Sequence, residues 1–134
     1  MASCKACGYD KSLSVIKSYE LTIAGRLPSQ NRLRPRFNSY AKNRYAVALL
    51  KQGRPYVTGR KRRVWITRLF GKRGRSYDIG NLVGGAKPLI DALVTTGWLV
   101  DDSPKWLECH YSQHRSDTDR HLIRIVIEDV SWKE

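Results

Sequence analysis

With 134 residues, this chain is long enough for one domain with a modest hydrophobic core. Its formal net charge of +13 and its pI of about 10.1 are unlike those of ordinary metabolic enzymes. No acidic residue lies between Glu20 and Asp78, whereas arginines and lysines recur through that interval. This charge distribution favours nucleic acid as the partner. It does not favour a membrane surface, because the basic residues do not follow one long amphipathic helix.

The N-terminal residues predict little ordered structure. Residues 1–14 are small and polar, so we expect a disordered tail ahead of a single domain over residues 15–134. The tail lacks the apolar core of a signal peptide, and no segment of the chain reaches membrane-spanning length. We therefore expect a cytoplasmic protein with no membrane partner.

Cys4 and Cys7 form a Cys-x-x-Cys pair, which is half of a common zinc-binding pattern. The site could be completed by Cys109 with His110 and His114, or shared between two copies of the chain. The pair could also carry no ligand. Strand alternation would point Cys109 and His110 to opposite faces, which argues against the first arrangement.

The first half of the domain predicts a strand, a helix and a strand. Polar and apolar residues alternate over residues 15–24, as in a half-buried strand. Asn38 can cap a helix that runs to about residue 52, where Gly53 and Pro55 follow. The next segment, Val64–Phe70, is rich in residues that favour strands.

The second half predicts a helix and two more strands. Apolar residues at helical spacing indicate a helix over residues 83–97, with Pro88 in its first turn and Gly97 at its end. Gly84 and Gly85 would leave backbone amides open near the start of that helix. Strands around residues 107–111 and 123–127 would form a terminal hairpin. The order is βαβαββ, an α+β fold with a small mixed sheet and two helices.

Three groups of basic side chains lie in or beside turns, and we expect them to contact DNA phosphates. They are Arg32, Arg34 and Arg36; Arg60, Lys61 and Arg62; and Lys72, Arg73 and Arg75. The last group lies in a glycine-containing loop, which could instead be a solvated hairpin tip.

Acidic residues recur around one lysine between residues 77 and 108. The acids are Asp78, Asp91, Asp101 and Asp102, and the lysine is Lys87. Magnesium takes one or two carboxylates together with substrate phosphate oxygens, so this grouping is typical of a metal site for phosphodiester chemistry. Lys87 could offset charge on the attacking or leaving oxygen. Each acid taken alone could equally be a helix cap or a solvated surface residue.

The same stretch resembles the RusA-type Holliday junction resolvases, including their phage-borne relatives. The resemblance is carried by Asp78-Ile79-Gly80-Asn81-Leu82, Lys87, Asp91-Ala92-Leu93, Gly97 and Asp101-Asp102. A Gly84-Gly85 spacer before the lysine is similar to that of a phage-type subgroup. With the opening segment Leu27-Pro28-Ser29-Gln30-Asn31, the resemblance extends from about Val15 to Val130.

The resemblance implies a homodimer that binds four-way DNA junctions in recombination and repair and nicks two opposing strands with Mg²⁺ or Mn²⁺. It implies a bacterial or phage-infected host cell. Asp78 and Asp102 would be metal ligands supported by Asp101, Lys87 would be the catalytic lysine, and Asp91 would support the site.

Gly80 departs from the family pattern, which has an aspartate ligand at this position. Losing one carboxylate from a small set weakens metal binding, because few ligands remain. The alternative is therefore a catalytically inactive protein that binds junctions or other nucleic acid on the same scaffold. An RNA-binding protein of ribosomal type would explain the charge but would leave the acidic residues without a role.

Overall fold

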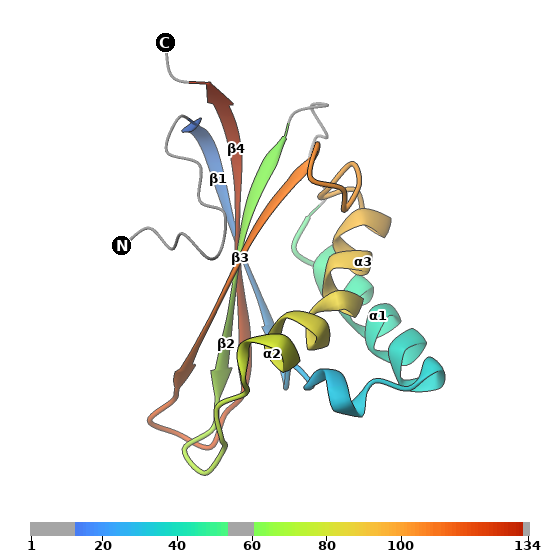
Figure 1. The fold of residues 1–134 in the computed structure, drawn as a ribbon, viewed down its shortest axis with the longest axis vertical. Helices are drawn as coiled ribbons and strands as arrows, with labels where there is room; N and C mark the ends of the chain where they lie inside the picture. Colours follow the sequence, from blue (N-terminus) through green and yellow to red (C-terminus); the bar gives the residue numbers. More distant parts are fainter. Residues whose placement is uncertain (1–12, 54–60, 133–134) are drawn as a thin grey trace.

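A four-stranded mixed sheet carries its helices on one face (Figure 1). The structure is a computed structural model that describes residues 13–53 and 61–132. The strands are β1 (Leu13–Ala24), β2 (Arg62–Phe70), β3 (Leu107–Arg115) and β4 (Leu122–Trp132). Their spatial order is β1-β4-β2-β3; β2 and β3 run parallel, and the other two pairings are antiparallel. The predicted α+β class with a mixed sheet is confirmed.

The helical segments lie between the strands in sequence. They are the short 3-10 helix η2 (Gln30–Arg32), α1 (Pro35–Leu50), α2 (Ile79–Gly85) and α3 (Lys87–Thr95). The segment from β2 to β3 passes through α2 and α3, which is the kind of crossover that two parallel strands require. None of the helices in the described ranges combines the length and apolar character needed to span a membrane.

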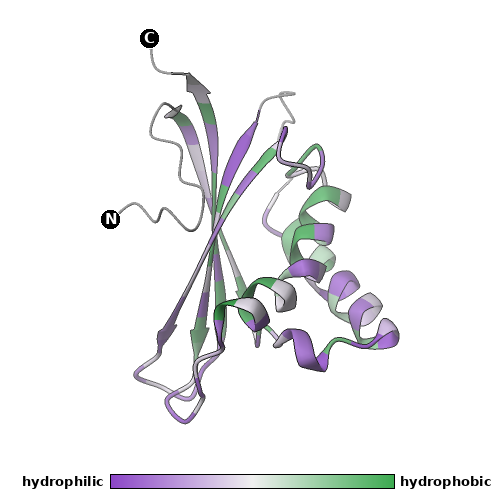
Figure 2. Cartoon of the chain, in the orientation of Figure 1, coloured by the Kyte–Doolittle hydropathy of each residue, from purple (hydrophilic) through white to green (hydrophobic). Residues whose placement is uncertain are grey.

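The hydrophobic core lies between the sheet and the helices. Leu89 and Leu93 of α3 are fully buried there against Ile125 and Ile127 of β4 and Tyr45 of α1, within one cluster. Figure 2 shows α3 as largely hydrophobic and α1 as hydrophilic over much of its length. Helix α3 is therefore the central element of the helical layer, while α1 exposes one side to solvent.

The predicted helix over residues 83–97 is wrong in its first part, because two short helices take its place. Helix α2 already begins after Asp78, whose side chain accepts a hydrogen bond from the backbone N–H of Asn81. Ala86 separates α2 from α3, and Pro88 lies in the first turn of α3 as expected. Gly97 has a φ of 88° and follows the end of α3, also as expected.

Gly84 and Gly85 do not lie at a helix N-terminus, so the expected open amides are not found there. Both glycines belong to the last turn of α2. A β-carbon on Gly85 would overlap the carbonyl oxygen of Pro28, and one on Gly84 would overlap the side chain of Gln30. These glycines allow α2 to pack closely on the segment that precedes α1.

The predicted terminal hairpin is wrong, because β3 and β4 are not neighbours in the sheet. Strand β4 pairs with β1 and β2, and β3 lies at the edge beside β2. Two smaller boundaries also differ. Helix α1 begins at Pro35, not after Asn38, and Leu13 and Ser14 belong to β1, not to a tail. Proline is favoured in the first helical turn, which explains the earlier start.

Arg62 was expected to contact DNA, and this prediction is wrong. Its side chain is buried beside the core, where Nε lies 2.6 Å from Asp129 Oδ1 and a second nitrogen donates to the Trp98 carbonyl oxygen. Arg62 and Asp129 are register partners on β2 and β4. Strand pairing thus joins two charges that lie 67 residues apart in the sequence.

Candidate active site

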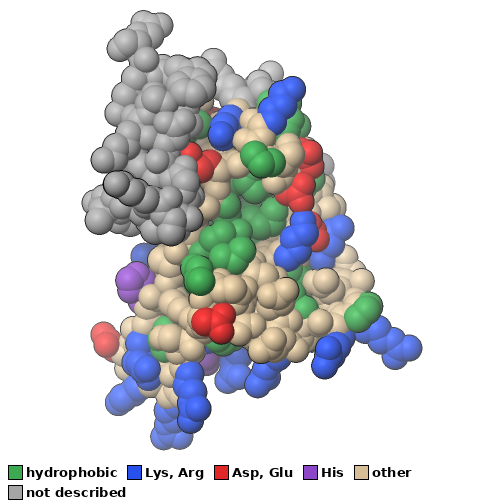
Figure 3. All heavy atoms as spheres, in the orientation of Figure 1, with side chains coloured by type: hydrophobic (Ala, Val, Ile, Leu, Met, Phe, Trp, Pro, Cys, Tyr) green, Lys and Arg blue, Asp and Glu red, His purple; other side chains and the backbone are tan. Residues whose placement is uncertain are grey.

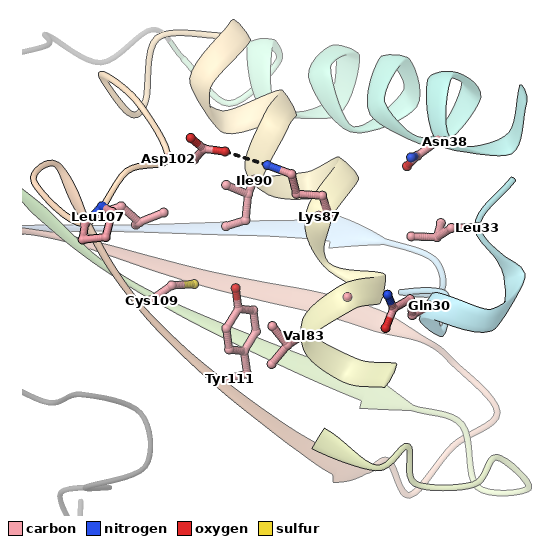
Figure 4. Close-up of a pocket in the computed structure, with 12 residues that line it drawn as sticks. Gln30, Leu33, Asn38, Val83, Lys87, Ile90, Asp102, Leu107, Cys109 and Tyr111 are labelled. Atoms are coloured by element: carbon pink, nitrogen blue, oxygen red, sulfur yellow. Dashed lines mark hydrogen bonds and ion pairs between the residues drawn. The ribbon is translucent and has the colours of Figure 1, made fainter. Parts of the chain in front are cut away.

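A groove runs between the helical layer and the first half of β3. It has a volume of about 640 Å³, and its walls come from η2, the start of α1, α2, α3, the loop after α3 and β3. Figure 4 shows Val83, Ile90, Cys109 and Tyr111 along its apolar side, with Lys87 and Asp102 above them and Gln30, Leu33 and Asn38 at one end. The groove therefore combines an apolar wall with a charged rim.

Lys87 is the centre of the charged rim. Its ammonium group lies 2.6 Å from Asp102 Oδ2 and 3.1 Å from Asp91 Oδ1. Asp91 is one helical turn after Lys87 on α3, and this spacing of four residues places the two side chains on one face. Asp102 comes from the loop that follows α3, 15 residues along the chain.

The loop that carries Asp102 is held by its neighbour. Asp101 Oδ1 accepts a hydrogen bond of 2.8 Å from the backbone N–H of Asp102. Both aspartates are exposed. Three carboxylates (Asp91, Asp101 and Asp102) and one ammonium group (Lys87) give this cluster a formal charge of −3 + 1, or −2, which favours a cation.

The ion pairs keep Lys87 charged. Hydrogen bonding to Asp102 raises the pKa of Lys87; desolvation opposes this rise, and a weaker contribution from the hydrogen bond to Asp91 adds to it. The hydrogen bond from Lys87 in turn lowers the pKa of Asp102. Lys87 is therefore an ammonium ion at neutral pH, suited to stabilise negative charge and not to accept a proton.

Asp78 occupies a different position from the other predicted site residues. It is the N-cap of α2, and its second carboxylate oxygen accepts a hydrogen bond of 3.0 Å from the Asn81 side chain. Asn81 therefore holds the turn at the start of α2. Asp78 does not line the groove, whereas Lys87 and Asp102 do. The structure thus joins Lys87 to Asp91 and Asp102, and Asp102 to Asp101, whereas the hydrogen bonds found for the Asp78 carboxylate within the described residues go to Asn81.

The donor set fits a weakly held divalent cation. The described residues contain no group of three or more His, Cys, Asp or Glu side chains arranged around one metal position. Magnesium does not require such a cage, because one or two carboxylates suffice when phosphate oxygens and water complete its coordination. Asp101 and Asp102 are exposed carboxylates on one loop and could supply that minimum.

Gly80 leaves room for the carboxylate that the family pattern would add. A β-carbon at this position would lie 3.5 Å from Asp78 Oδ1, and apart from its chain neighbours and the backbone of α2 no other atom of the described residues lies within 4 Å. Such a separation is an ordinary van der Waals contact. The local fold of α2 therefore tolerates an aspartate at residue 80.

The other basic residues expected to contact DNA have different environments. Arg32, Arg34 and Arg36 are exposed around η2 and the start of α1, and Lys72, Arg73 and Arg75 are exposed in the loop after β2. Lys61 is half-buried, and Arg60 lies outside the described residues.

The residues of the zinc hypothesis lie partly inside and partly outside the described ranges. Cys4 and Cys7 lie outside the described residues. Cys109 packs against the core cluster, while His110 lies on the other face of β3, 2.6 Å from Glu108 and stacked on Trp65. The prediction that Cys109 and His110 face opposite ways is confirmed.

Sequence reasoning missed most of the groove wall. Gln30, Asn38 and Val83 come from three different elements, and only the packing of α2 against η2 brings them together. Tyr111 packs against the core cluster and lines the groove, and the sequence analysis did not assign it to a site. Burial raises the pKa of Tyr111 well above its ordinary value, so its hydroxyl stays protonated. Its place after the acidic loop is the one signal that could have indicated a role.

A scan against protein-family models and a search of curated proteins both gave no match to this chain.

Proposed function

We propose that this protein is a divalent-metal-dependent endodeoxyribonuclease that acts on four-way DNA junctions as a homodimer. The observation that carries the proposal is the Lys87 ammonium group, held between Asp102 and Asp91 on the rim of a groove. The net charge of +13 supports a nucleic-acid substrate. The resemblance of residues 78–102 to RusA-type resolvases supports the junction as the preferred structure.

The residues of the cluster have distinct proposed roles. Asp101 and Asp102 would hold the metal, with Asp78 as a further ligand. A bound Mg²⁺ or Mn²⁺ lowers the pKa of water and offsets charge on the phosphate. Lys87 donates to the phosphate or to the leaving 3′ oxygen as negative charge develops there. Asp91 orients Lys87 through their ion pair.

A two-fold dimer suits the proposed substrate. A four-way junction has paired strands of like polarity, and cutting two of them symmetrically requires two equivalent sites. The exposed arginines around η2 and in the loop after β2 would hold the DNA by its phosphates. Binding should weaken steeply as the salt concentration rises.

Gly80 favours a second candidate function, a junction-binding protein that does not cut. A chain with one ligand fewer than the family pattern binds metal less tightly. In this case the basic surfaces would be used and the acidic cluster would have only a structural role. The two candidates differ in their response to divalent metal.

The test is nicking of a labelled synthetic four-way junction with and without Mg²⁺ or Mn²⁺. Wild type should nick only with metal, and Lys87→Ala should nick about 100-fold more slowly, as expected when one preorganised charge-stabilising donor is lost. Gly80→Asp should lower the metal concentration needed, while Gly80→Ala, which adds the same β-carbon without a carboxylate, should not.

Three outcomes separate the candidates. Metal-dependent nicking by wild type that is lost in Lys87→Ala supports the nuclease. Junction binding without nicking in wild type, with nicking in Gly80→Asp, supports the non-cutting protein. No binding to the junction at low salt by any variant would overturn both.

A further inference from the structure

The end of the sheet away from the acidic cluster is strongly basic. The loop after β2 and the loop from β3 to β4 meet there, and the chain leaving β1 passes beside them (Figure 1). We call this region the basic tip; its exposed cations are Arg26, Lys72, Arg73, Arg75, Arg115 and Arg120. Figure 3 shows lysine and arginine side chains gathered at this end of the molecule. Six cations against Asp117 and Asp119 leave a formal charge of +4.

Backbone hydrogen bonds tie the segments of the basic tip together. The N–H of Lys72 donates to the Thr118 carbonyl oxygen at 2.8 Å, and the N–H of Ser116 donates to that of Phe70 at 2.7 Å. The Arg115 guanidinium donates to the carbonyl oxygens of Lys72 and Gly74 at 2.9 and 3.0 Å. The basic side chains thus project from a braced framework, which lowers the entropy cost of binding a ligand.

A pocket of about 330 Å³ opens inside the basic tip. Its walls are Arg26 from the segment after β1, Gly71, Arg73 and Gly74 from the loop after β2, and Asp119 and His121 from the loop before β4. Residues from three segments far apart in the sequence therefore converge on one cavity. Two of its side chains are arginines, whose forked donors suit phosphate oxygens.

His121 adds a neutral donor to this pocket. Its Nδ1 accepts a hydrogen bond of 3.1 Å from the Gly71 N–H, so in the neutral ring Nε2 carries the hydrogen. Burial, and then the charges of Arg26 and Arg68, lower the pKa of His121 against a smaller opposing effect of Asp119. The ring lies directly over Gly71, where a β-carbon would be 2.9 Å from Nε2 and 2.9 Å from the Asp119 carbonyl oxygen.

We propose that the pocket formed by Arg26, Arg73 and His121 binds one backbone phosphate of a DNA duplex arm. This inference rests on the proposed function, because it takes DNA as the ligand. It adds a contact point for DNA that is separate from the groove. Strand β3 leads from Leu107, in the groove, to Arg115, in the basic tip. Eight steps of about 3.3 Å separate these residues by roughly 26 Å, less than one turn of duplex DNA. One arm can therefore reach both sites.

The geometry specifies backbone recognition and not base recognition. The pocket offers donors and a net positive charge, with Asp119 as its one acidic side chain. Such a site fixes the position of the duplex and does not select its sequence. Its contribution appears in the salt dependence of binding, because each neutralised phosphate releases counterions.

The test measures the dissociation constant of a blunt 30-base-pair duplex over a range of KCl concentrations. The Arg26→Ala/Arg73→Ala variant should reduce the slope of log K against log salt by about 0.9, the value for one lost phosphate contact. Gly71→Ala should reduce it similarly without changing the charge, because the added methyl group would meet both His121 Nε2 and the Asp119 carbonyl oxygen and so distort the pocket. The control Lys51→Ala/Arg124→Ala removes the same number of charges at exposed positions outside the pocket and should keep the wild-type slope.

Thermal denaturation of each variant verifies that it is folded. A wild-type slope in both pocket variants would overturn the proposal, as would an equal loss of slope in the control. Metal-dependent nicking of the junction is measured separately on the same variants at saturating protein. The salt dependence of duplex binding is measured without any cleavage of the DNA. If wild type fails to nick the junction, the nuclease proposal is refuted, but the phosphate pocket is still tested by the binding slopes.

Discussion

Replacing Asp129 by leucine should destabilise the fold more than any single change in the acidic cluster. The Asp129 carboxylate lies 2.6 Å from Arg62 Nε, and the two side chains are 7% and 3% exposed. The variant would leave the Arg62 guanidinium buried without that carboxylate. Truncating one member of a buried ion pair costs about 3–5 kcal/mol, because the remaining charge has already been desolvated.

This cost corresponds to a large shift in the melting temperature. An unfolding entropy of about 2.1 cal/mol/K per residue amounts to about 0.28 kcal/mol/K for a chain of 134 residues. The expected decrease in Tm for Asp129→Leu is therefore about 11–18 °C. The hydrogen bond from Arg62 to the Trp98 carbonyl oxygen remains and favours the lower end of this range.

Urea and thermal denaturation followed by circular dichroism provide the measurement. The double variant Arg62→Met/Asp129→Leu should recover most of the loss, since apolar pairs of similar volume replace buried ion pairs at little cost. Glu20→Gln weakens the exposed pair with Arg124, 3.6 Å apart, and should change the free energy of unfolding by less than about 1 kcal/mol. A loss below about 1 kcal/mol for Asp129→Leu, or no recovery in the double variant, would refute this reasoning.

Three further predictions concern other parts of the structure. Gly85→Ala should reduce the yield and stability of the folded protein, because the methyl group overlaps the Pro28 carbonyl oxygen, whereas Gly80→Ala should be tolerated; denaturation curves compare the two. Lys87 should react more slowly with an amine acylating reagent near pH 9 than other exposed lysines, and Asp102→Asn should reduce the difference, as mass spectrometry of labelled peptides would reveal. The His121 ring should titrate below pH 6.5 by NMR. Because the unfolded ring binds a proton first, stability should fall as pH drops from 6.5 through that lower pKa, and a midpoint above 6.5 would contradict the described burial.

The sequence predicted the strands better than it predicted their arrangement. Alternation predicted β1, β3 and β4, since a half-buried strand has a period of two, while β2 was predicted from the strand-favouring residues of Val64–Phe70. It could not reveal that β4 inserts between β1 and β2, because pairing between distant strands leaves no mark on local periodicity. The break at Ala86 was also hidden, because Leu82 and Leu89 both face the core and continue one apolar pattern across two helices.

The candidate site was predicted in part for similar reasons. Lys87 and Asp91 are four residues apart on one helix, so local geometry sufficed to join them. The ion pair from Lys87 to Asp102 depends on how the chain turns after α3, which only the folded structure reveals. Basic residues were assigned to a surface by charge alone. Arg62 was thereby misassigned, because its partner Asp129 lies in another strand.

The position of β4 has a consequence for how the protein assembles during synthesis. Within the described sheet, β4 is the only neighbour of β1, and it also borders β2. Of the four described strands, β1 is made first and β4 last, so β1 gains its hydrogen-bonding partner only after β4 has been synthesised. Contacts between chain positions as distant as Leu13 and Trp132 close late and slow folding. Until then the edge of β1 is open to other chains, so C-terminal truncations that remove β4 should produce aggregates and not a smaller soluble domain.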